Sequence, residues 1–393
     1  MKLLQINTTV NTGSTGRIAE GIGRKALELG HESCIAYGRG VVDSRSVTIR
    51  IGGTVSRLMH GAKSYLQDRH GFGSAMATKE LIQQIDELHP DIIHLHNLHG
   101  YYLHIGYLFR YLKKSNIPVV WTLHDCWSFT GHCAFYEGVN CNKWETGCHD
   151  CPLTRRYPSS LGILDNSAKN YVEKKELLAN MPKMLLVCPS QWLADEVGRS
   201  FLHKYHRVVI PNGVDTTQFR PHNNKEKMIL GVANVWSTRK GLKDFVELRK
   251  GLDSSINIVL IGLSASQISE LPDGMTGISR TENVEELVSW YSRAGIFVNP
   301  TYVDNFPTTN LEALACGTPV LTYYTGGSPE AVDESTGWVV PKGDVRAMKH
   351  IIETKLSNNN DFDKACRDKA VSQFDAQTNF ARYFKHYQNL LDA

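Results

Sequence analysis

The sequence predicts an α/β protein of two domains, each built on a parallel sheet with crossover helices. Short apolar runs alternate with amphipathic segments along the chain, which is the pattern of strands joined by helices. The 393 residues suffice for two domains with separate cores, and a turn-rich break at 211–215 divides them. We expect domains over residues 1–205 and 206–375. A last helix within 376–393 either crosses back to the first domain or packs on its own.

The apolar runs predict six strands in each half of the chain. In the first half they lie at 2–7, 33–37, 91–96, 119–123, 184–188 and 207–210. In the second half they lie at 228–233, 256–261, 276–279, 295–299, 319–323 and 337–340. The intervening helices are expected at 17–29, 102–114, 190–201, 242–251, 284–294 and 345–356. Ligands of such sheets bind beyond the carboxyl ends of the strands, so two facing domains imply a cleft between them.

Composition excludes several classes of protein. A hydrophobic content of 41% and a charged content of 21% are those of a globular domain protein, and a net charge of +3 is too small to indicate nucleic-acid binding. No apolar run reaches the roughly 18 residues of a membrane span. The first residues become polar too soon for a signal peptide and predict a strand. We therefore expect a cytoplasmic protein, in which the nine cysteines are not presumed to form disulfides.

The segment 304–319 combines two carboxylates, Asp304 and Glu312, with a predicted helix start. Pro307 suits the first position of a helix, and the residues that follow are strong helix formers. A helix that begins here leaves its first backbone N–H groups without intrahelical partners, and together with the helix dipole they can bind phosphate. These groups belong to Thr308, Thr309, Asn310 and Leu311. An ordinary capped helix start has the same pattern.

This segment resembles the donor-site motif of the retaining glycosyltransferases of family 4, which have the GT-B fold of two Rossmann-like domains. The family pattern is Glu, seven residues, Glu, and then Ala-x-Ala-x-Gly-x-Pro. Glu312 takes the second position here, whereas Asp304 stands at the first. The run 326–330 also matches. The likeness runs the length of the chain and is greatest to the branch that builds bacterial colanic-acid-type and other surface polysaccharides. It implies a hexosyltransferase that uses a UDP- or GDP-linked sugar.

Two glycine-containing loops are candidates for donor binding. The loop 11–16 follows the first strand, and Gly13 and Gly16 would let the backbone approach a ligand closely. It lacks the complete Gly-x-Gly-x-x-Gly spacing and the lysine of a P-loop, so a plain turn fits as well. The second loop contains Arg239 and Lys240, cations suited to a diphosphate.

In the resembled family, the first of these loops faces the donor phosphates and the acceptor. The family also has a Lys-Gly pair in the second loop, and Lys240 with the glycine after it matches that pair. The family arginine, however, would fall at Val235, which carries no charge. Two alternatives follow: Arg239 supplies the positive charge of the family arginine, or this chain lacks that charge.

His124 ends a predicted strand and would point into the cleft. A histidine that merely packs is the alternative, but the resembled family has a cleft histidine at this place. The resemblance implies that His124 hydrogen-bonds the transferred sugar rather than acting as an acid or base. His94 and His96 share one face of a neighbouring strand and would either contact the acceptor or pack.

The resemblance also implies a mechanism. Family 4 enzymes are thought to retain configuration without a covalent intermediate, unlike double-displacement glycosidases. The acceptor then attacks the face that the diphosphate leaves, and the leaving phosphate is the base. Glu312 would bind the ribose and Asp304 the hydroxyls of the donor sugar. No catalytic metal is expected, because the helix start and Lys240 would neutralise the diphosphate, together with Arg239 if it replaces the missing family cation.

A block of cysteines within the expected insertion at 126–160 predicts a structural zinc site. Its members are Cys133, Cys141, Cys148 and Cys151. Four thiolates that include one Cys-x-x-Cys pair suit tetrahedral zinc, although seven residues separate the first two. Free thiols, a disulfide and an iron–sulfur cluster are the alternatives, and His132 or His149 could replace one sulfur.

The predicted partners are a nucleotide-sugar donor and a glycan or polyprenyl-diphosphate-linked acceptor, with no nucleic acid. Arg155, Arg156 and the nearby tyrosines would suit contact with the inner face of the membrane, but also a plain solvated surface. The alternative functions are a nucleotide-sugar epimerase on the same GT-B fold, a Rossmann oxidoreductase and a zinc-dependent adaptor. An epimerase would turn over nucleotide sugar without an acceptor.

Overall fold

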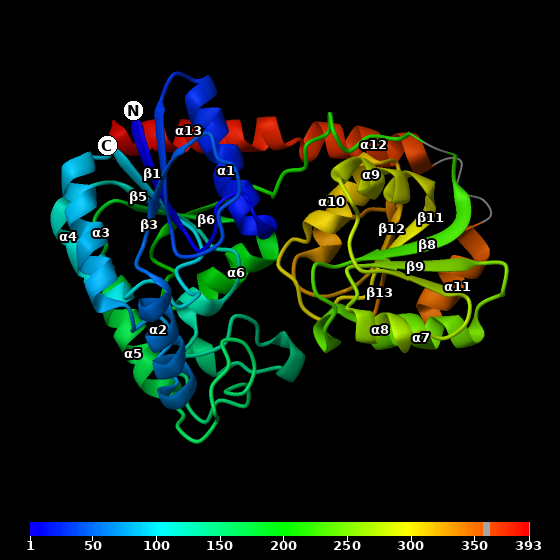
Figure 1. The fold of residues 1–393 in the computed structure, drawn as a ribbon, viewed down its shortest axis with the longest axis horizontal. Helices are drawn as coiled ribbons and strands as arrows, with labels where there is room; N and C mark the ends of the chain where they lie inside the picture. Colours follow the sequence, from blue (N-terminus) through cyan, green and yellow to red (C-terminus); the bar gives the residue numbers. More distant parts are fainter. Residues whose placement is uncertain (223, 357–361, 393) are drawn as a thin grey trace. The chain divides into compact units, whose positions relative to one another are not determined.

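The structure, a computed structural model, describes residues 1–222, 224–356 and 362–392. These residues form two compact units (Figure 1). The first unit is Met1–Ile210 together with the chain from Phe380 onward, and the second is Pro211–Asn379.

The first unit is built on a seven-stranded sheet in the order β3-β2-β1-β4-β5-β6-β7, in which every neighbouring pair is parallel. The central strands are short and buried along their whole length, because helices cover both faces of a parallel sheet. The strands are β1 (Lys2–Asn7), β2 (Glu32–Tyr37), β3 (Val47–Arg50), β4 (Ile92–Leu95), β5 (Val119–Thr122), β6 (Met184–Cys188) and β7 (His206–Val209).

Seven α-helices accompany this sheet within the described residues. They are α1 (Gly13–Glu28), α2 (Thr54–Gln67), α3 (Ala75–Leu88), α4 (Ile105–Ser115), α5 (Ser167–Leu178), α6 (Gln191–Arg199) and, from Phe380 on, α13 (Ala376–Leu391). Residues between β5 and α5 form only 3₁₀ turns, at Trp127–Phe129, Glu137–Val139 and Lys143–Glu145. The last helix is fixed to this unit by Tyr387, which is fully buried and hydrogen-bonds His94 Nδ1 at 2.7 Å.

The second unit has a six-stranded parallel sheet in the order β10-β9-β8-β11-β12-β13. Its strands are β8 (Glu226–Val232), β9 (Asn257–Ile261), β10 (Met275–Ile278), β11 (Ala294–Asn299), β12 (Val320–Tyr323) and β13 (Gly337–Val340). Its helices are α7 (Leu242–Gly251), α8 (Ala265–Ser269), α9 (Val284–Arg293), α10 (Thr308–Ala315), α11 (Val345–Lys355) and α12 (Phe362–Gln373). Separate apolar clusters pack on the two faces of this sheet.

All twelve predicted strands are present, within a few residues of their expected ends. The sequence did not predict β3 or the helices α2, α3, α5, α8 and α12. None of the helices described is both long and apolar enough to cross a membrane.

Candidate active site

In the second unit, two cations meet a carboxylate beyond the carboxyl ends of β8 and β11. Lys240 Nζ lies 2.6 Å from Asp304 Oδ2, and Arg239 Nη1 lies 3.7 Å from the same oxygen. Burial raises the pKa of Asp304, but the charges of Lys240 and Arg239 outweigh it and lower the pKa overall. The carboxylate is therefore ionised. Val235, where the resembled family has arginine, is exposed.

The local backbone holds these cations in place. The 3₁₀ turn η4 (Thr238–Lys240) follows β8, and Tyr302 N–H donates to the Arg239 carbonyl at 2.8 Å. Gly241 then adopts a φ of +73°, and a Cβ there would lie 2.2 Å from the Pro300 carbonyl oxygen. Only glycine fits this approach, so the Lys-Gly pair is needed for the turn as well as for its charge.

Glu312 lies in the first turns of α10, with a side chain that is almost fully buried. Tyr291 of α9 donates its hydroxyl to Glu312 Oε2 at 2.8 Å. The Tyr291 carbonyl in turn accepts a hydrogen bond from Thr318 Oγ1 at 2.6 Å. The protein thus holds one oxygen of the Glu312 carboxylate, which orients the group.

The start of α10 differs in two respects from the prediction. Pro307 occupies the N-cap, with an extended backbone, rather than the first helical position, and it provides no side-chain cap. The N–H of Asn310, predicted to be a free donor, already donates to the Pro307 carbonyl at 3.1 Å. The Asn310 side chain is fully buried and bonds Asn299 and Ser328, so it joins the helix to its neighbours. Thr308 and Thr309 begin the helix as predicted.

In the first unit, the loop between β1 and α1 contains Gly13 and Gly16. Gly13 has a φ of +66°, and a Cβ added there would meet nothing within 4 Å, so the backbone is open on that side. Gly16 is different, because its Cβ would lie 2.7 Å from Thr9 Oγ1. Gly13 therefore suits the approach of a ligand, whereas Gly16 is needed for packing within the loop.

His124 follows β5 and continues a row of histidine rings. Its Nε2 lies 3.1 Å from His96 Nδ1, and the two rings are stacked. His96 Nε2 in turn lies 3.0 Å from Gln5 Oε1. His94 is the third ring of the row, next to His96. Burial lowers the pKa of all three histidines, that of His124 to about 4, so they are neutral at pH 7.

The hydrogen bonds also define the tautomer of His124. Gln5 Nε2 donates to the Ala19 carbonyl at 2.8 Å, which orients the amide so that Gln5 Oε1 accepts from His96 Nε2–H. His96 Nδ1 is then an acceptor and must receive the Nε2 proton of His124. This makes Nδ1 of His124 an acceptor.

A second polar cluster beside His124 was not recognised from the sequence. Asp125 Oδ2 lies 2.7 Å from His99 Nε2, and the Tyr157 hydroxyl lies 2.9 Å from His99 Nδ1. Burial raises the pKa of Asp125, but His99 and the other hydrogen bonds lower it overall. The sequence signal was the His124-Asp125 pair at a strand end, but its partners come from distant segments.

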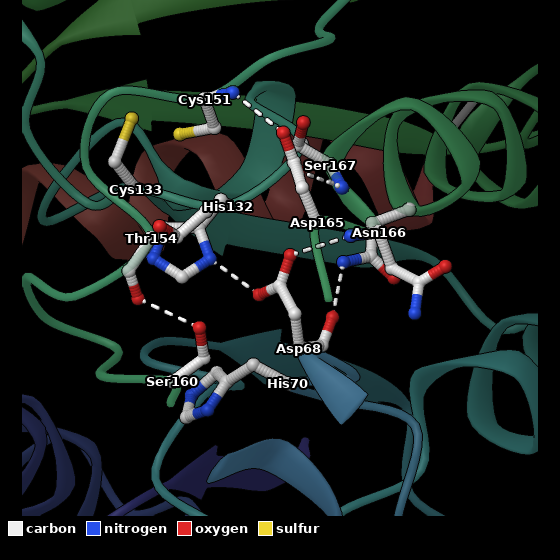
Figure 2. Close-up of polar contacts among 12 residues, drawn as sticks. Asp68, His70, His132, Cys133, Cys151, Thr154, Ser160, Asp165, Asn166 and Ser167 are labelled. Atoms are coloured by element: carbon white, nitrogen blue, oxygen red, sulfur yellow. Dashed lines mark hydrogen bonds and ion pairs between the residues drawn. The ribbon is translucent and has the colours of Figure 1, made fainter. Parts of the chain in front are cut away.

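The cysteine block packs against the core of the first unit. Cys133 is buried, and its thiol contacts that of Cys151. Cys148 Sγ accepts the Gly131 N–H at 3.1 Å. Figure 2 shows His132 beside Cys133 and Cys151, with its Nδ1 2.5 Å from Asp68 Oδ1.

Two further observations bear on the metal prediction. His132 Nε2 is buried and has no hydrogen-bond partner within the part of the chain that the structure describes. Among those same residues, no three His, Cys, Asp or Glu side chains are arranged as a metal site. The zinc site stays a prediction.

Comparison with known proteins identifies the family. The profile described as Glycosyltransferase Family 4 matches residues 16–218, more than half of the chain, and that of Glycosyl transferases group 1 matches residues 226–358. The chain belongs to glycosyltransferase family 4. The putative colanic acid biosynthesis glycosyl transferase WcaC of Escherichia coli K12 is 25% identical over 423 aligned residues, which cover 99% of this chain and 100% of WcaC. The capsular polysaccharide biosynthesis glycosyltransferase CapM of Staphylococcus aureus is 25% identical over 198 residues, 44% of this chain and 52% of CapM.

Solved structures agree on the fold of this glycosyltransferase. Sucrose-phosphate synthase from Thermosynechococcus elongatus superimposes with a TM-score of 0.74 at 18% identity and covers 100% of this chain and 99% of that one. HepE from Anabaena, solved in complex with UDP-glucose, gives 0.67 at 14% identity over 99% of this chain and 100% of HepE. The predicted GT-B fold is confirmed.

Proposed function

We propose that this glycosyltransferase retains configuration and transfers a sugar from a UDP- or GDP-linked donor to a glycan or polyprenyl-diphosphate-linked glycan of a bacterial surface polysaccharide. The observation that carries the proposal is the pairing of Lys240 and Arg239 with Asp304, which lies shortly before the start of α10 in the sequence. The names of WcaC and CapM support the pathway, and the UDP-glucose complex of HepE supports the class of donor.

The proposed chemistry assigns charge neutralisation to Lys240, Arg239 and the start of α10. The departing diphosphate gains negative charge, and preorganised cations and N–H donors stabilise that charge in the transition state. In the structure, Asp304 pairs with both cations. A bound diphosphate would also contact Lys240 and Arg239. The Asp304 oxygens could then accept hydrogen bonds from the hydroxyls of the donor sugar. Glu312, held by Tyr291, would accept from the ribose.

His124 would bind the transferred sugar as a neutral acceptor. The hydrogen bonds from Gln5 through His96 fix its tautomer, so Nδ1 can accept a sugar hydroxyl. A pKa of about 4 argues against a role as a general acid or base near neutral pH. The leaving phosphate would then accept the proton of the attacking hydroxyl, and no catalytic metal is required.

The test is the thermal stability of the protein with UDP, GDP, ADP and their sugar conjugates. A ligand at a hundredfold excess over its Kd adds about 2.7 kcal/mol to the free energy of unfolding, so the cognate nucleotide should raise Tm measurably. Glu312→Gln, which retains an acceptor for the Tyr291 hydroxyl, should weaken binding by roughly 10- to 100-fold, because a charge-assisted hydrogen bond to the ribose is lost.

Glu285→Gln, an exposed carboxylate in the first turn of α9, is the matched control and should bind as the parent chain does. No response to any nucleotide in folded protein would contradict the donor site. Isomerisation of a nucleotide sugar without acceptor would instead indicate an epimerase.

We also propose that Cys133, Cys141, Cys148 and Cys151 bind a structural zinc ion. All four pack against one apolar core, and Cys133 and Cys151 are already in contact. The buried, unpartnered His132 Nε2 offers an alternative ligand. Because no metal site is preformed among the described residues, some of these side chains must turn to bind the ion. A tetrahedral thiolate site would then crosslink a segment that has only 3₁₀ turns.

The expected metal content is about one zinc per chain in protein purified without chelator. Cys148→Ser combined with Cys151→Ser should abolish the zinc and lower Tm, whereas Cys34→Ser, a buried thiol of β2 outside the block, should keep it. Zinc-free protein that folds and resists chelators would contradict the proposal. Iron with visible absorption would indicate a cluster instead.

A further inference from the structure

A row of hydrogen bonds in the first unit runs from Asp125 through His99 to Tyr157. Asp125 Oδ2 lies 2.7 Å from His99 Nε2, and His99 Nδ1 lies 2.9 Å from the Tyr157 hydroxyl. The other carboxylate oxygen, Oδ1, accepts the Trp127 N–H at 2.9 Å. We call Asp125, His99 and Tyr157 the polar triad. It begins next to His124, the residue proposed to bind the transferred sugar.

The direction of these hydrogen bonds follows from the charge of Asp125. Burial raises the pKa of Asp125, but the charge and the hydrogen bond of His99 lower it overall, so the carboxylate is ionised and can only accept. His99 Nε2 must therefore carry a proton and donate it. In the neutral ring Nδ1 is then an acceptor, and it receives the proton of the Tyr157 hydroxyl. The phenolic oxygen keeps its lone pairs, so it can accept from a further donor.

Tyr157 differs from the other two members of the triad because it is open to solvent. Tyr157 is 46% exposed, whereas the side chains of His99 and Asp125 are 8% and 12% exposed. Burial and the charge of Asp125 raise the pKa of Tyr157, so the phenol keeps its proton near neutral pH. A tyrosine ring offers a rigid apolar face together with a polar end. Tyr157 therefore suits a ligand that has both an apolar face and hydroxyl groups, as a sugar ring has.

A buried tyrosine nearby shows the purely structural arrangement. The Tyr102 hydroxyl donates to the Asn97 carbonyl at 2.7 Å, and Tyr102 is only 2% exposed. Its hydrogen bond and its ring both stabilise the interior. At Tyr157 the buried groups instead orient a hydroxyl on a ring that is half exposed, which is the arrangement of a binding group supported from within.

The loop that contains His99 is held tightly after β4. Thr8 Oγ1 donates to the His99 carbonyl at 2.8 Å, and the Gly100 N–H donates to His70 Nε2 at 3.3 Å. The next residue, Tyr101, has a φ of +68°, which is an unfavourable conformation for a bulky side chain. Backbone strain of this kind persists where the surrounding contacts impose it, and it is concentrated at ligand sites.

The strained residue Tyr101 brings a second aromatic ring to the same place. The ring centroids of Tyr101 and Tyr157 lie 4.7 and 6.1 Å from that of His70, which is buried. The phenol of Tyr101 is also close enough to act on the pKa of Tyr157. Two tyrosines that pack on one buried ring thus form an aromatic surface around the oriented hydroxyl.

We propose that Tyr157 binds the sugar acceptor, with its oxygen accepting a hydroxyl of that sugar and its ring packing against the sugar face. His99 and Asp125 are positioning residues, because they orient the Tyr157 hydroxyl without touching the substrate. Tyr101 would extend the contact along the sugar. The inference rests on the proposed function, since it assigns the acceptor of that transfer. Tyr157 takes no part in proton transfer, which stays with the leaving phosphate.

The experiment is transfer to p-nitrophenyl glycosides of glucose, galactose and mannose from the nucleotide sugar identified by thermal shift. Tyr157→Phe keeps the ring and removes the hydroxyl. It should raise KM for the best glycoside roughly three- to tenfold, the worth of one hydrogen bond, and leave kcat nearly unchanged. The rise in Tm that the nucleotide causes should persist, because Lys240 and Glu312 belong to the second unit.

Asp125→Asn tests the positioning role. An amide has one accepting and one donating arm, so it cannot accept from both His99 and Trp127. If the donating arm meets His99 Nε2, the ring takes the other tautomer and Nδ1 donates to Tyr157 instead of accepting. KM for the glycoside should rise as in Tyr157→Phe. The double variant should be no worse than the poorer single variant, because the three groups act as one unit.

Tyr65→Phe is the matched control, because Tyr65 lies on α2 of the same unit and is 47% exposed. It should leave KM and kcat unchanged. A glycoside KM unchanged by Tyr157→Phe, in protein that still binds nucleotide, would overturn this inference alone. Additive losses in the double variant, or hydrolysis of the donor without transfer to any glycoside, would overturn it too. Protein that binds no nucleotide would overturn the proposed function and this assignment with it.

Discussion

Replacing Lys240 with alanine is expected to lower kcat/KM for sugar transfer by about 10²- to 10³-fold, the usual effect of removing one preorganised group that stabilises developing charge. The Lys240 ammonium contacts Asp304 directly and is more buried than Arg239. A buried cation interacts with a diphosphate through less solvent, so its loss is not compensated by water or salt. Steady-state kinetics with the donor identified by thermal shift would measure the effect.

The matched comparison is Arg239→Ala. The Arg239 side chain is 37% exposed, lies farther from Asp304 and already donates to the Val303 carbonyl. We expect it to contribute roughly tenfold, about 1.4 kcal/mol. If Arg239→Ala were the more damaging change, Arg239 would be the cation that replaces the family arginine absent at Val235. Equal and small effects of both variants would contradict the proposed role of this pair.

The fold was largely predictable because parallel strands are short, continuous apolar runs. Strand β3 was not predicted because it lies at the sheet edge and most of its residues are exposed, so its sequence has no continuous apolar run. Helix α5 was not predicted for a related reason. Its buried positions include Asn170 and Lys174, and the Lys174 ammonium is satisfied by the carbonyls of Trp127 and Thr130. Only tertiary contacts make such polar residues interior ones.

The candidate site was predictable where it is local in sequence. Asp304 lies between the end of β11 at Asn299 and the start of α10 at Thr308. The spacing of residues along the chain therefore predicts that these three features lie close together. The tautomer of His124 depends instead on Gln5 and His96, which are 91 positions apart. The environment of Glu312 likewise depends on Tyr291 of another helix. Spacing along the chain carries no information about such contacts.

The same long-range contacts predict that the first unit loses stability as pH falls from 7 to 5.5. Six histidines there have strongly lowered pKa values: His60, His70, His94, His96, His104 and His124. The unfolded chain takes up protons below a pKa of about 6.5, whereas the folded chain does not until far lower pH. Each such histidine should therefore cost about 1.4 kcal/mol of unfolding free energy per pH unit below 6.5.

Geometry supports a lowered pKa for His60, because its Nε2 accepts two backbone N–H groups and cannot bind a proton without breaking those hydrogen bonds. His132 acts in the opposite direction. Burial lowers its pKa, but Asp68 raises it overall, so its stabilising contribution is present at low pH and is lost only as pH rises through the raised pKa. One histidine with a raised pKa does not offset six with strongly lowered pKa values.

Urea denaturation at several pH values would measure this slope. His60→Gln should reduce the slope, since glutamine can still accept from the two glycines but does not titrate, whereas His89→Gln, at an exposed position, should leave it unchanged. A midpoint that stays constant between pH 7 and 5.5 would show that these imidazoles are not held neutral. The tautomer assigned to His124 would then lose its support, because that assignment requires a neutral row of rings.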